Sequence, residues 1–247
     1  MSTESTHHIP DDSALAEAAK SAVHLGTIDR LKTLLRDHPE LATARIGSAG
    51  QSRTMLHVAT DWPGHFPHVA DSIRVLVAAG ANVNAQFIGG HSETPLHWAA
   101  SCDDVDALDA LLDAGADIEA PGAVLGGGAP LADACGFSQW NAAGRLVERG
   151  ASTRLKDAAA LGLMDRVEAY FESGSPDTDT ITAALWSASK GRQRKAAQYL
   201  LGHGGDLNWI GWDDQTCLDI ALAGDDTEFI AWLCERGAKT AAEIQQT

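Results

Sequence analysis

The sequence predicts an all-α solenoid, in which helix–turn–helix units of similar length stack side by side. Three observations predict it: a short motif recurs along almost the whole chain, a Gly-Ala pair follows most of its copies, and 43 alanines stand against an aromatic content of only 6%. Self-similarity at a fixed period is typical of repeat architectures. Small side chains allow neighbouring helices to approach closely, and stacking buries the apolar face that a single unit leaves uncovered.

The clearest copy of the motif runs from Thr94 through Pro95, Leu96 and His97 to Ala100, and it is followed by a leucine pair and Gly115-Ala116. This copy resembles the ankyrin repeat, a unit of roughly 33 residues. The resemblance implies two helices per unit, β-hairpin fingers between units and a concave groove. The stretches 57–67, 93–101 and 207–214 are similar to those of stand-alone bacterial ankyrin-repeat proteins, a likeness that adds no activity.

Seven repeats are predicted after a disordered lead-in over residues 1–12. The first helix of each unit is rich in small residues, and the second carries an apolar stripe at helical spacing, such as Val105, Leu108 and Leu111. The closing glycine supplies a left-handed helix cap. The predicted repeats form one domain over 13–247, with approximate ranges 13–46, 51–86, 91–121, 126–153, 154–178, 182–210 and 213–243.

Charge and composition exclude several classes of partner. The chain has 34 acidic and 18 basic residues, a formal charge of −16, which argues against nucleic acid and anionic membranes because phosphate binding needs a positive surface. The sequence has no apolar segment of membrane-spanning length and no paired spacing among the four cysteines. Residues 1–12 lack the charged and apolar regions of a signal peptide, so we expect none. We therefore expect a soluble, cytoplasmic monomer that uses no cofactor and no metal.

Two of the predicted fingers are unusually long. From the closing glycine to the next histidine-equivalent position the family spacing is about 15 residues, whereas Gly80 to His97 and Gly115 to Ala132 each span 17. From Gly150 to Lys156 the spacing is only 6, so the finger between repeats four and five is nearly missing. The long fingers, 87–91 and 121–128, combine glycines with exposed apolar residues. They act either as flaps over an apolar ligand or as fingers packed on one another.

A second departure from the repeat pattern is the turn between the helices of repeat two. It is expanded by five residues over 61–68, and prolines at positions 63 and 67 stiffen it.

The predicted concave positions of repeats two to five gather aromatic side chains and carboxylates. Such a mixture is typical of a ligand pocket. The candidate ligand-binding residues are Trp62, Phe87, Trp98, Cys102, Val124, Phe137, Trp209 and Trp212. The candidate acid–base residues are His91, Asp133, Asp157 and Asp61, since a carboxylate beside Trp98 under a flap is desolvated and its pKa rises.

Simpler interpretations stand beside these assignments. The resemblance makes His57 and His97 structural hydrogen-bonding residues, and Trp186 replaces this histidine in repeat six. Asp133 and Asp157 also fit a merely acidic, soluble surface. Cys102 as a nucleophile needs a nearby base, and His65 with His68 as metal ligands needs a third ligand. The basic residues of segment 190–195 form either a solvated face or an anion site.

Two functional hypotheses follow. The first is a binding protein whose concave face and long fingers in repeats two to five form a walled aromatic and acidic pocket for a protein partner or a small apolar molecule. The second is an enzyme on the same scaffold, an isomerase, lyase or hydrolase, in which His91 with Asp133 or Asp157 transfers protons. Phosphate loops and nucleophile elbows are absent from the sequence, so no standard reaction class is indicated.

Overall fold

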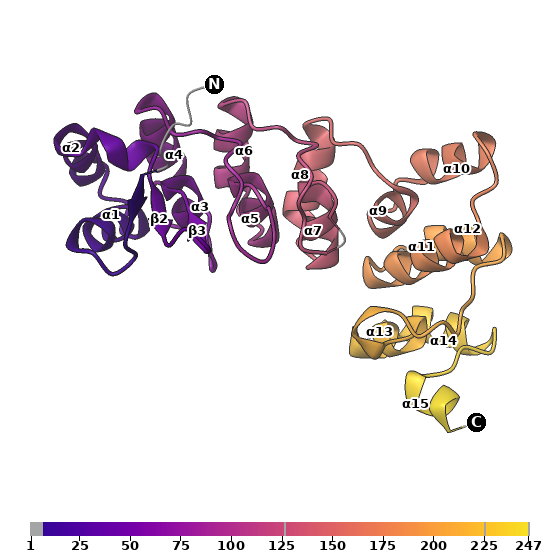
Figure 1. The fold of residues 1–247 in the computed structure, drawn as a ribbon. Helices are drawn as coiled ribbons and strands as arrows, with labels where there is room; N and C mark the ends of the chain where they lie inside the picture. The colour runs from indigo at the N-terminus through magenta and orange to yellow at the C-terminus, as the bar shows by residue number, and fades with distance from the viewer. Residues whose placement is uncertain (1–6, 126, 225, 247) are drawn as a thin grey trace. The chain divides into compact units, whose positions relative to one another are not determined.

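The computed structural model describes residues 7–125, 127–224 and 226–246, and it is built almost entirely of paired helices (Figure 1). Contacts within the chain divide it into two compact parts, unit 1 up to Ala151 and unit 2 from Ser152. The predicted all-α solenoid is confirmed, whereas the single domain over 13–247 and its seven ranges stay a prediction. Across the described part of the chain, every helix is too short or too polar to cross a membrane.

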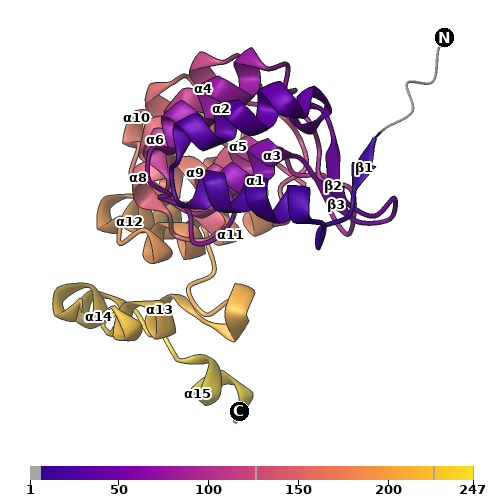
Figure 2. The same cartoon turned by 90° about the vertical axis from the view of Figure 1, so that its left-hand side faces the viewer.

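Unit 1 consists of four helix pairs in two layers (Figure 2). The inner helices α1, α3, α5 and α7 pack on one another, and so do the outer helices α2, α4, α6 and α8. Their bounds are α1 (Ala14–His24), α2 (Ile28–Asp37), α3 (Met55–Ala59), α4 (Val69–Ala78), α5 (Pro95–Ser101), α6 (Val105–Asp113), α7 (Pro130–Gly136) and α8 (Trp140–Glu148), with a short 3-10 turn η1 (Pro39–Ala42) after α2.

Unit 2 continues the helix pairs and shares one hydrophobic core. The inner helix α11 packs on both α9 and α13. The bounds are α9 (Leu155–Ala160), α10 (Met164–Glu172), α11 (Thr178–Lys190), α12 (Arg194–Gly202), η2 (Trp212–Asp214), α13 (Cys217–Ala223), α14 (Thr227–Cys234) and α15 (Ala241–Gln245). The last helix begins at a Thr240 capping box, at the place where a further inner helix is due.

The recurring motif works as a helix start. In α3 and α5 the threonine side chain accepts the backbone N–H of the third helical residue, and the histidine at that position accepts the backbone N–H of the threonine. This reciprocal bonding satisfies donors that every helix N-terminus leaves open. Alanines such as Ala99 and Ala100 are fully buried, so these small side chains lie where the helices pack on one another.

The only strands of the described residues form a small sheet of order β1-β2-β3. Strands β2 (Arg45–Gly47) and β3 (Ser52–Arg53) pair antiparallel as the first finger, and β1 (His8–Ile9) adds parallel to β2. Ile9 is buried. The disordered lead-in predicted over 1–12 is therefore wrong at residues 8 and 9, because their backbone pairs with β2, while residues 1–6 lie outside the described range.

A regular hydrogen bond joins consecutive repeats. His57 Nε2 donates to the carbonyl of Glu93 at 3.1 Å, and His97 Nε2 donates to the carbonyl of Gly128 at 3.3 Å. Each acceptor directly precedes the N-cap of the next inner helix. In unit 2 the indole of Trp186 donates to the carbonyl of Gln215 at 2.8 Å in the same arrangement. The predicted structural role of the histidines agrees with these bonds, and Trp186 supplies the same N–H.

Burial keeps these histidines neutral. His57 is completely buried, and desolvation lowers its pKa from 6.5 to about 3, against the raising effect of the Glu93 carbonyl. Burial also lowers the pKa of His97. The geometry agrees, since Nδ1 of each ring accepts from the N-cap threonine and Nε2 carries the only proton.

Lowering the pH from 7.5 to 5 will destabilise the fold through His57. Below pH 6.5 this histidine is protonated in the unfolded chain, whereas in the folded chain it stays neutral down to about pH 3. The free energy of unfolding therefore decreases as the pH is lowered across this range. One pH unit corresponds to about 1.4 kcal/mol, which gives a loss of about 2 kcal/mol at pH 5. Urea unfolding at both pH values measures it.

In the His57→Asn variant the difference between the two pH values will shrink by that amount. His38→Asn, at an exposed position, is the matched control for the loss of one histidine. An undiminished pH dependence in His57→Asn would contradict the assignment.

Candidate functional site

A buried carboxylate, Glu93, ties both long fingers to the inner helix α5. Only 5% of Glu93 is exposed. Its carboxylate accepts the indole N–H of Trp98 at 2.9 Å and the backbone N–H of Val124, in the second finger, at 3.0 Å. It also lies 3.1 Å from Nδ1 of His91 in the first finger. Burying a carboxylate is unfavourable unless donors surround it, and the Trp98 indole and the Val124 amide provide two.

The first long finger packs its rings against α5. Phe87 and His91 stack with centroids 4.5 Å apart and planes 15° apart. Phe87 lies 5.7 Å from Trp98, and the Trp98 ring contacts His57 edge-on at 4.9 Å. Three of the predicted site residues, Phe87, His91 and Trp98, are thus brought together, and their rings contact one another. The finger is filled with its own aromatic side chains.

The second long finger folds down over α7. The Leu125 N–H donates to Asp133 at 3.4 Å. A Cβ built on Gly136 would come within 2.3 Å of a terminal methyl group of Leu125, so the Leu125 side chain lies directly against the backbone of α7. Asp133 is fully buried beneath it. Val124, Leu125 and Phe137, by contrast, are exposed.

The expanded turn of repeat two is clamped at both sides. Phe66 stacks on His24 of α1 with ring centroids 4.3 Å apart. The backbone N–H of His65 donates to Asp104 at 2.6 Å, and its imidazole bonds to the Cys102 carbonyl at 3.0 Å. These contacts reach repeats one and three, so the turn holds a fixed shape, as its prolines predict. His65 is engaged here by protein groups.

Cys102 is a neutral thiol at physiological pH. It is half-buried and donates weakly to the Thr60 carbonyl, with sulfur and oxygen 3.7 Å apart. Burial raises its pKa to about 11, and the charges of Asp61 and Asp104 add to the shift. Because the thiolate is the nucleophile, this environment does not suit Cys102 to covalent catalysis.

The four acid–base candidates have four separate sets of partners. Asp61 pairs with Arg53 at 2.5 Å, His91 with Glu93, and Asp133 with the Leu125 amide. Asp157 belongs to unit 2, where it accepts the backbone N–H of Arg154 at 3.0 Å and its guanidinium at 2.9 Å.

The predicted concave position of Asp157 is wrong by one residue. With Arg154 at the N-cap, Asp157 is the third helical residue of α9, the place that His97 takes in α5. Lys156 is therefore not the histidine equivalent. Because the finger before α9 is nearly missing, the sequence has no Thr-Pro pair there to mark the start of the helix.

Trp209 and Trp212 also belong to unit 2. With Trp186 they form a cluster whose ring planes meet at 76° to 86°. The ammonium groups of Lys156 and Lys190 lie over the rings of Trp212 and Trp186, at 4.9 Å and 5.3 Å from the centroids. Cation–π contacts of this kind stabilise the finger itself.

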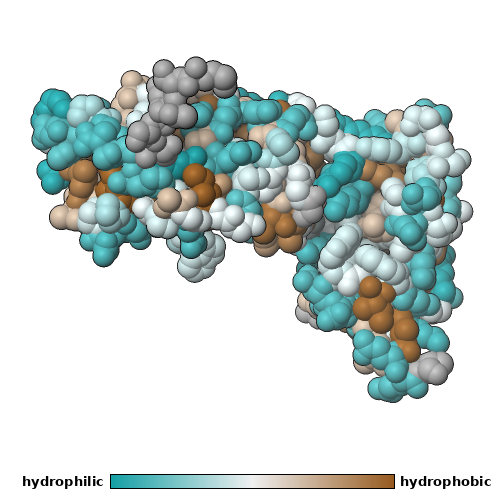
Figure 3. All heavy atoms as spheres, viewed as in Figure 1, coloured by the Kyte–Doolittle hydropathy of each residue, from teal (hydrophilic) through white to brown (hydrophobic). Residues whose placement is uncertain are grey.

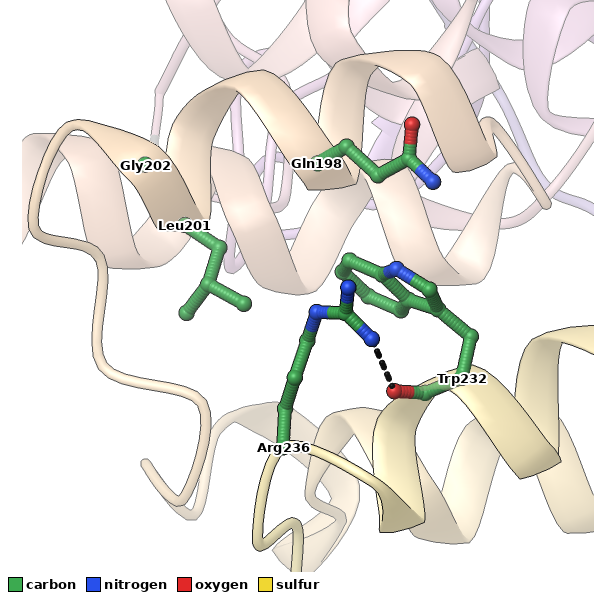
Figure 4. A pocket seen from close by; sticks show the side chains of 5 residues that line it. All are labelled: Gln198, Leu201, Gly202, Trp232 and Arg236. Atoms are coloured by element: carbon green, nitrogen blue, oxygen red, sulfur yellow. Dashed lines mark hydrogen bonds between the residues drawn. The ribbon is translucent and has the colours of Figure 1, made fainter.

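A groove of about 430 Å³ lies elsewhere, between α12 and α14 (Figure 4). The Arg236 guanidinium covers the Trp232 ring at 4.3 Å and donates to the Trp232 carbonyl at 3.0 Å. No predicted site residue lines this groove. Within the described ranges, no three His, Cys, Asp or Glu side chains are placed to hold a metal ion.

The exposed apolar side chains of unit 1 follow the inner helices. We define the apolar row as Leu25, Trp62, Cys102 and Phe137, one residue from each repeat at the end of its inner helix or in the turn that follows. Leu25 is 67% exposed, Trp62 81% and Phe137 45%, whereas Cys102, in repeat three, is half-buried. Figure 3 shows hydrophobic residues at the surface beside α7. The second finger adds Val124 and Leu125.

Glu93 was not among the residues predicted from the sequence. It directly precedes the Thr94 N-cap, a position held by Arg53, Gly128 and Gln215 in other repeats. The signal that could have found it is a carboxylate at the base of a long finger, with a tryptophan five residues later.

Replacing Glu93 with alanine will loosen both fingers. The indole of Trp98 and the amide of Val124 lose a charged acceptor, and a buried donor without a partner costs about 1–3 kcal/mol. Hydrogen exchange of the Val124 amide will speed up by about ten- to a hundredfold. Glu172→Ala, at an exposed position, is the control and leaves this rate unchanged. Equal rates in wild type and Glu93→Ala would refute the role.

Comparisons with known proteins agree with this geometry. A family model described as ankyrin repeats, in three copies, matches residues 15–122. No curated protein matches the chain. Among solved structures, the crystal structure of the human ASB11 ankyrin repeat domain is similar, with 20% sequence identity, 84% of this chain and 91% of that chain covered, and a TM-score of 0.51.

The two findings cover different parts of the chain. The family model identifies the repeats of unit 1 from α1 to the start of the second long finger. The solved structure is alike in fold over most of the chain. Together with the repeated helix starts and the bonds between repeats, they show ankyrin repeats over residues 15–122 and the ankyrin fold over most of the chain.

Proposed function

We propose that unit 1 binds a protein partner through the apolar row and the tip of the second finger. Ankyrin repeats are generally protein-interaction modules, although a fold alone does not fix a function. The observation that carries the proposal is the exposure of Leu25, Trp62 and Phe137 at or just after the ends of the inner helices of repeats one, two and four. Isolated exposed apolar residues are common, but an ordered series of them favours an interface.

The row is suited to hold a partner because its surroundings are already ordered. The turn that carries Trp62 is fixed by His65 and Phe66, and Phe137 follows the last turn of α7. Binding then loses little conformational entropy. Tryptophan is also the residue type most enriched among side chains that dominate interface energies.

A binding face is favoured over an enclosed pocket for a small apolar molecule. Leu125 lies against Gly136, and Phe87 with His91 covers Trp98. Both long fingers therefore place their own side chains where a small molecule would sit. The exposed apolar surface that remains lies along the row.

Replacing Trp62 or Phe137 with serine will remove partner binding and leave the fold intact. Loss of a central aromatic side chain costs about 2 kcal/mol or more of binding energy, at least a tenfold loss of affinity. Quantitative affinity capture from the source cell, with wild type and each variant as bait, measures this loss. Because both side chains are exposed, the free energy of unfolding changes by no more than about 1 kcal/mol. Thermal unfolding of each variant measures this change.

Leu222→Ser is the matched control, since Leu222 is an exposed leucine on the inner helix α13 of unit 2. It will retain the partner. A partner captured equally by wild type, Trp62→Ser and Phe137→Ser, or lost with Leu222→Ser, would contradict the proposal.

A further inference from the structure

We propose that the segment seated on the apolar row is basic and amphipathic, with large apolar side chains next to lysine or arginine. This inference rests on the proposed function, because it names the chemistry of the partner for the same face. Two features of unit 1 carry it: the carboxylates beside the row, and the absence of lysine and arginine along a long stretch of the chain.

Inner helices end at the row, where Leu25, Cys102 and Phe137 are the C-cap residues of α1, α5 and α7. The outer helices α2, α6 and α8 begin three residues after these caps, so the negative end of each inner helix lies beside the positive end of an outer helix. The helix dipoles therefore oppose one another at the row, and its preference for charge is set by side chains.

Carboxylates flank two members of the row. Asp61 precedes Trp62, and Asp103 follows Cys102. Asp61 accepts from Arg53 and from the Trp62 amide, while Asp103 accepts from Asn141 and the Ala142 amide. A carboxylate offers about four lone-pair positions. Each can thus accept a further bond from an incoming ammonium or guanidinium group.

Positive charge is scarce around the row. Between Arg74 and Arg145 the chain has nine acidic residues and no lysine or arginine. Over residues 1–151 there are 19 acidic and 9 basic residues, a difference of −10. Two arginines of unit 1 form ion pairs with carboxylates: Arg53 with Asp61 and Asp11, and Arg145 with Asp109. Such a field attracts basic ligands and repels acidic ones.

A pair of synthetic peptides tests the inference. The probe is an 18-residue helical peptide of leucine and lysine with one apolar face, and its match replaces every lysine with glutamate. Fluorescence anisotropy in 150 mM NaCl measures affinity for the full chain. We expect the lysine peptide to bind at least tenfold tighter than the glutamate peptide. Trp62→Ser and Phe137→Ser will each weaken it about tenfold and Asp61→Asn about threefold, while Leu222→Ser has no effect.

The outcomes separate this inference from the proposed function. If both peptides bind equally and Trp62→Ser weakens both, the face binds partners but does not select charge, and the inference fails alone. If the lysine peptide binds regardless of Trp62→Ser and Phe137→Ser, it is held by diffuse charge away from the row, which overturns the inference. Preference for the glutamate peptide, or no binding of either, also overturns it.

Discussion

The stacking of the repeats depends on one kind of hydrogen bond, which recurs at four places in the described chain. A side chain at the start of an inner helix donates to the backbone carbonyl just before the next inner helix, as His57 does to Glu93 and His97 to Gly128. A buried carbonyl without a donor is costly, so each finger is held where the previous repeat supplies an N–H. Trp186 and Thr216 supply it in unit 2, which shows that the N–H or O–H matters more than the residue type.

The same bond explains why Glu93 occupies a special place. Its carbonyl completes the link to His57, while its carboxylate gathers Trp98, Val124 and His91. One residue thus joins the link between repeats to both long fingers. The side chains of the fingers pack against α5 and α7. The apolar surface that remains exposed in unit 1 therefore lies at the ends of the inner helices and at the tip of the second finger.

Much of the fold follows from the sequence because its determinants are local. The Thr-Pro-Leu-His start, the closing glycine and the buried alanines each act within one repeat, so they predict the helices directly. The failures have a different origin. The register of Asp157 was lost where the motif lacks Thr-Pro, and the contact of Leu125 with Gly136 depends on how a glycine-rich finger folds. Glu93 was missed because its donors come from three separate segments.

The central claim is that a partner lies on the apolar row, and photo-crosslinking tests it most directly. A photoreactive phenylalanine analogue at Phe137 keeps the aromatic ring at the row, and the same analogue at Leu222 samples an exposed inner-helix position of unit 2. The account predicts one crosslinked partner from position 137 and none from position 222. Crosslinking from 222 alone, or the same product from both positions, would contradict it.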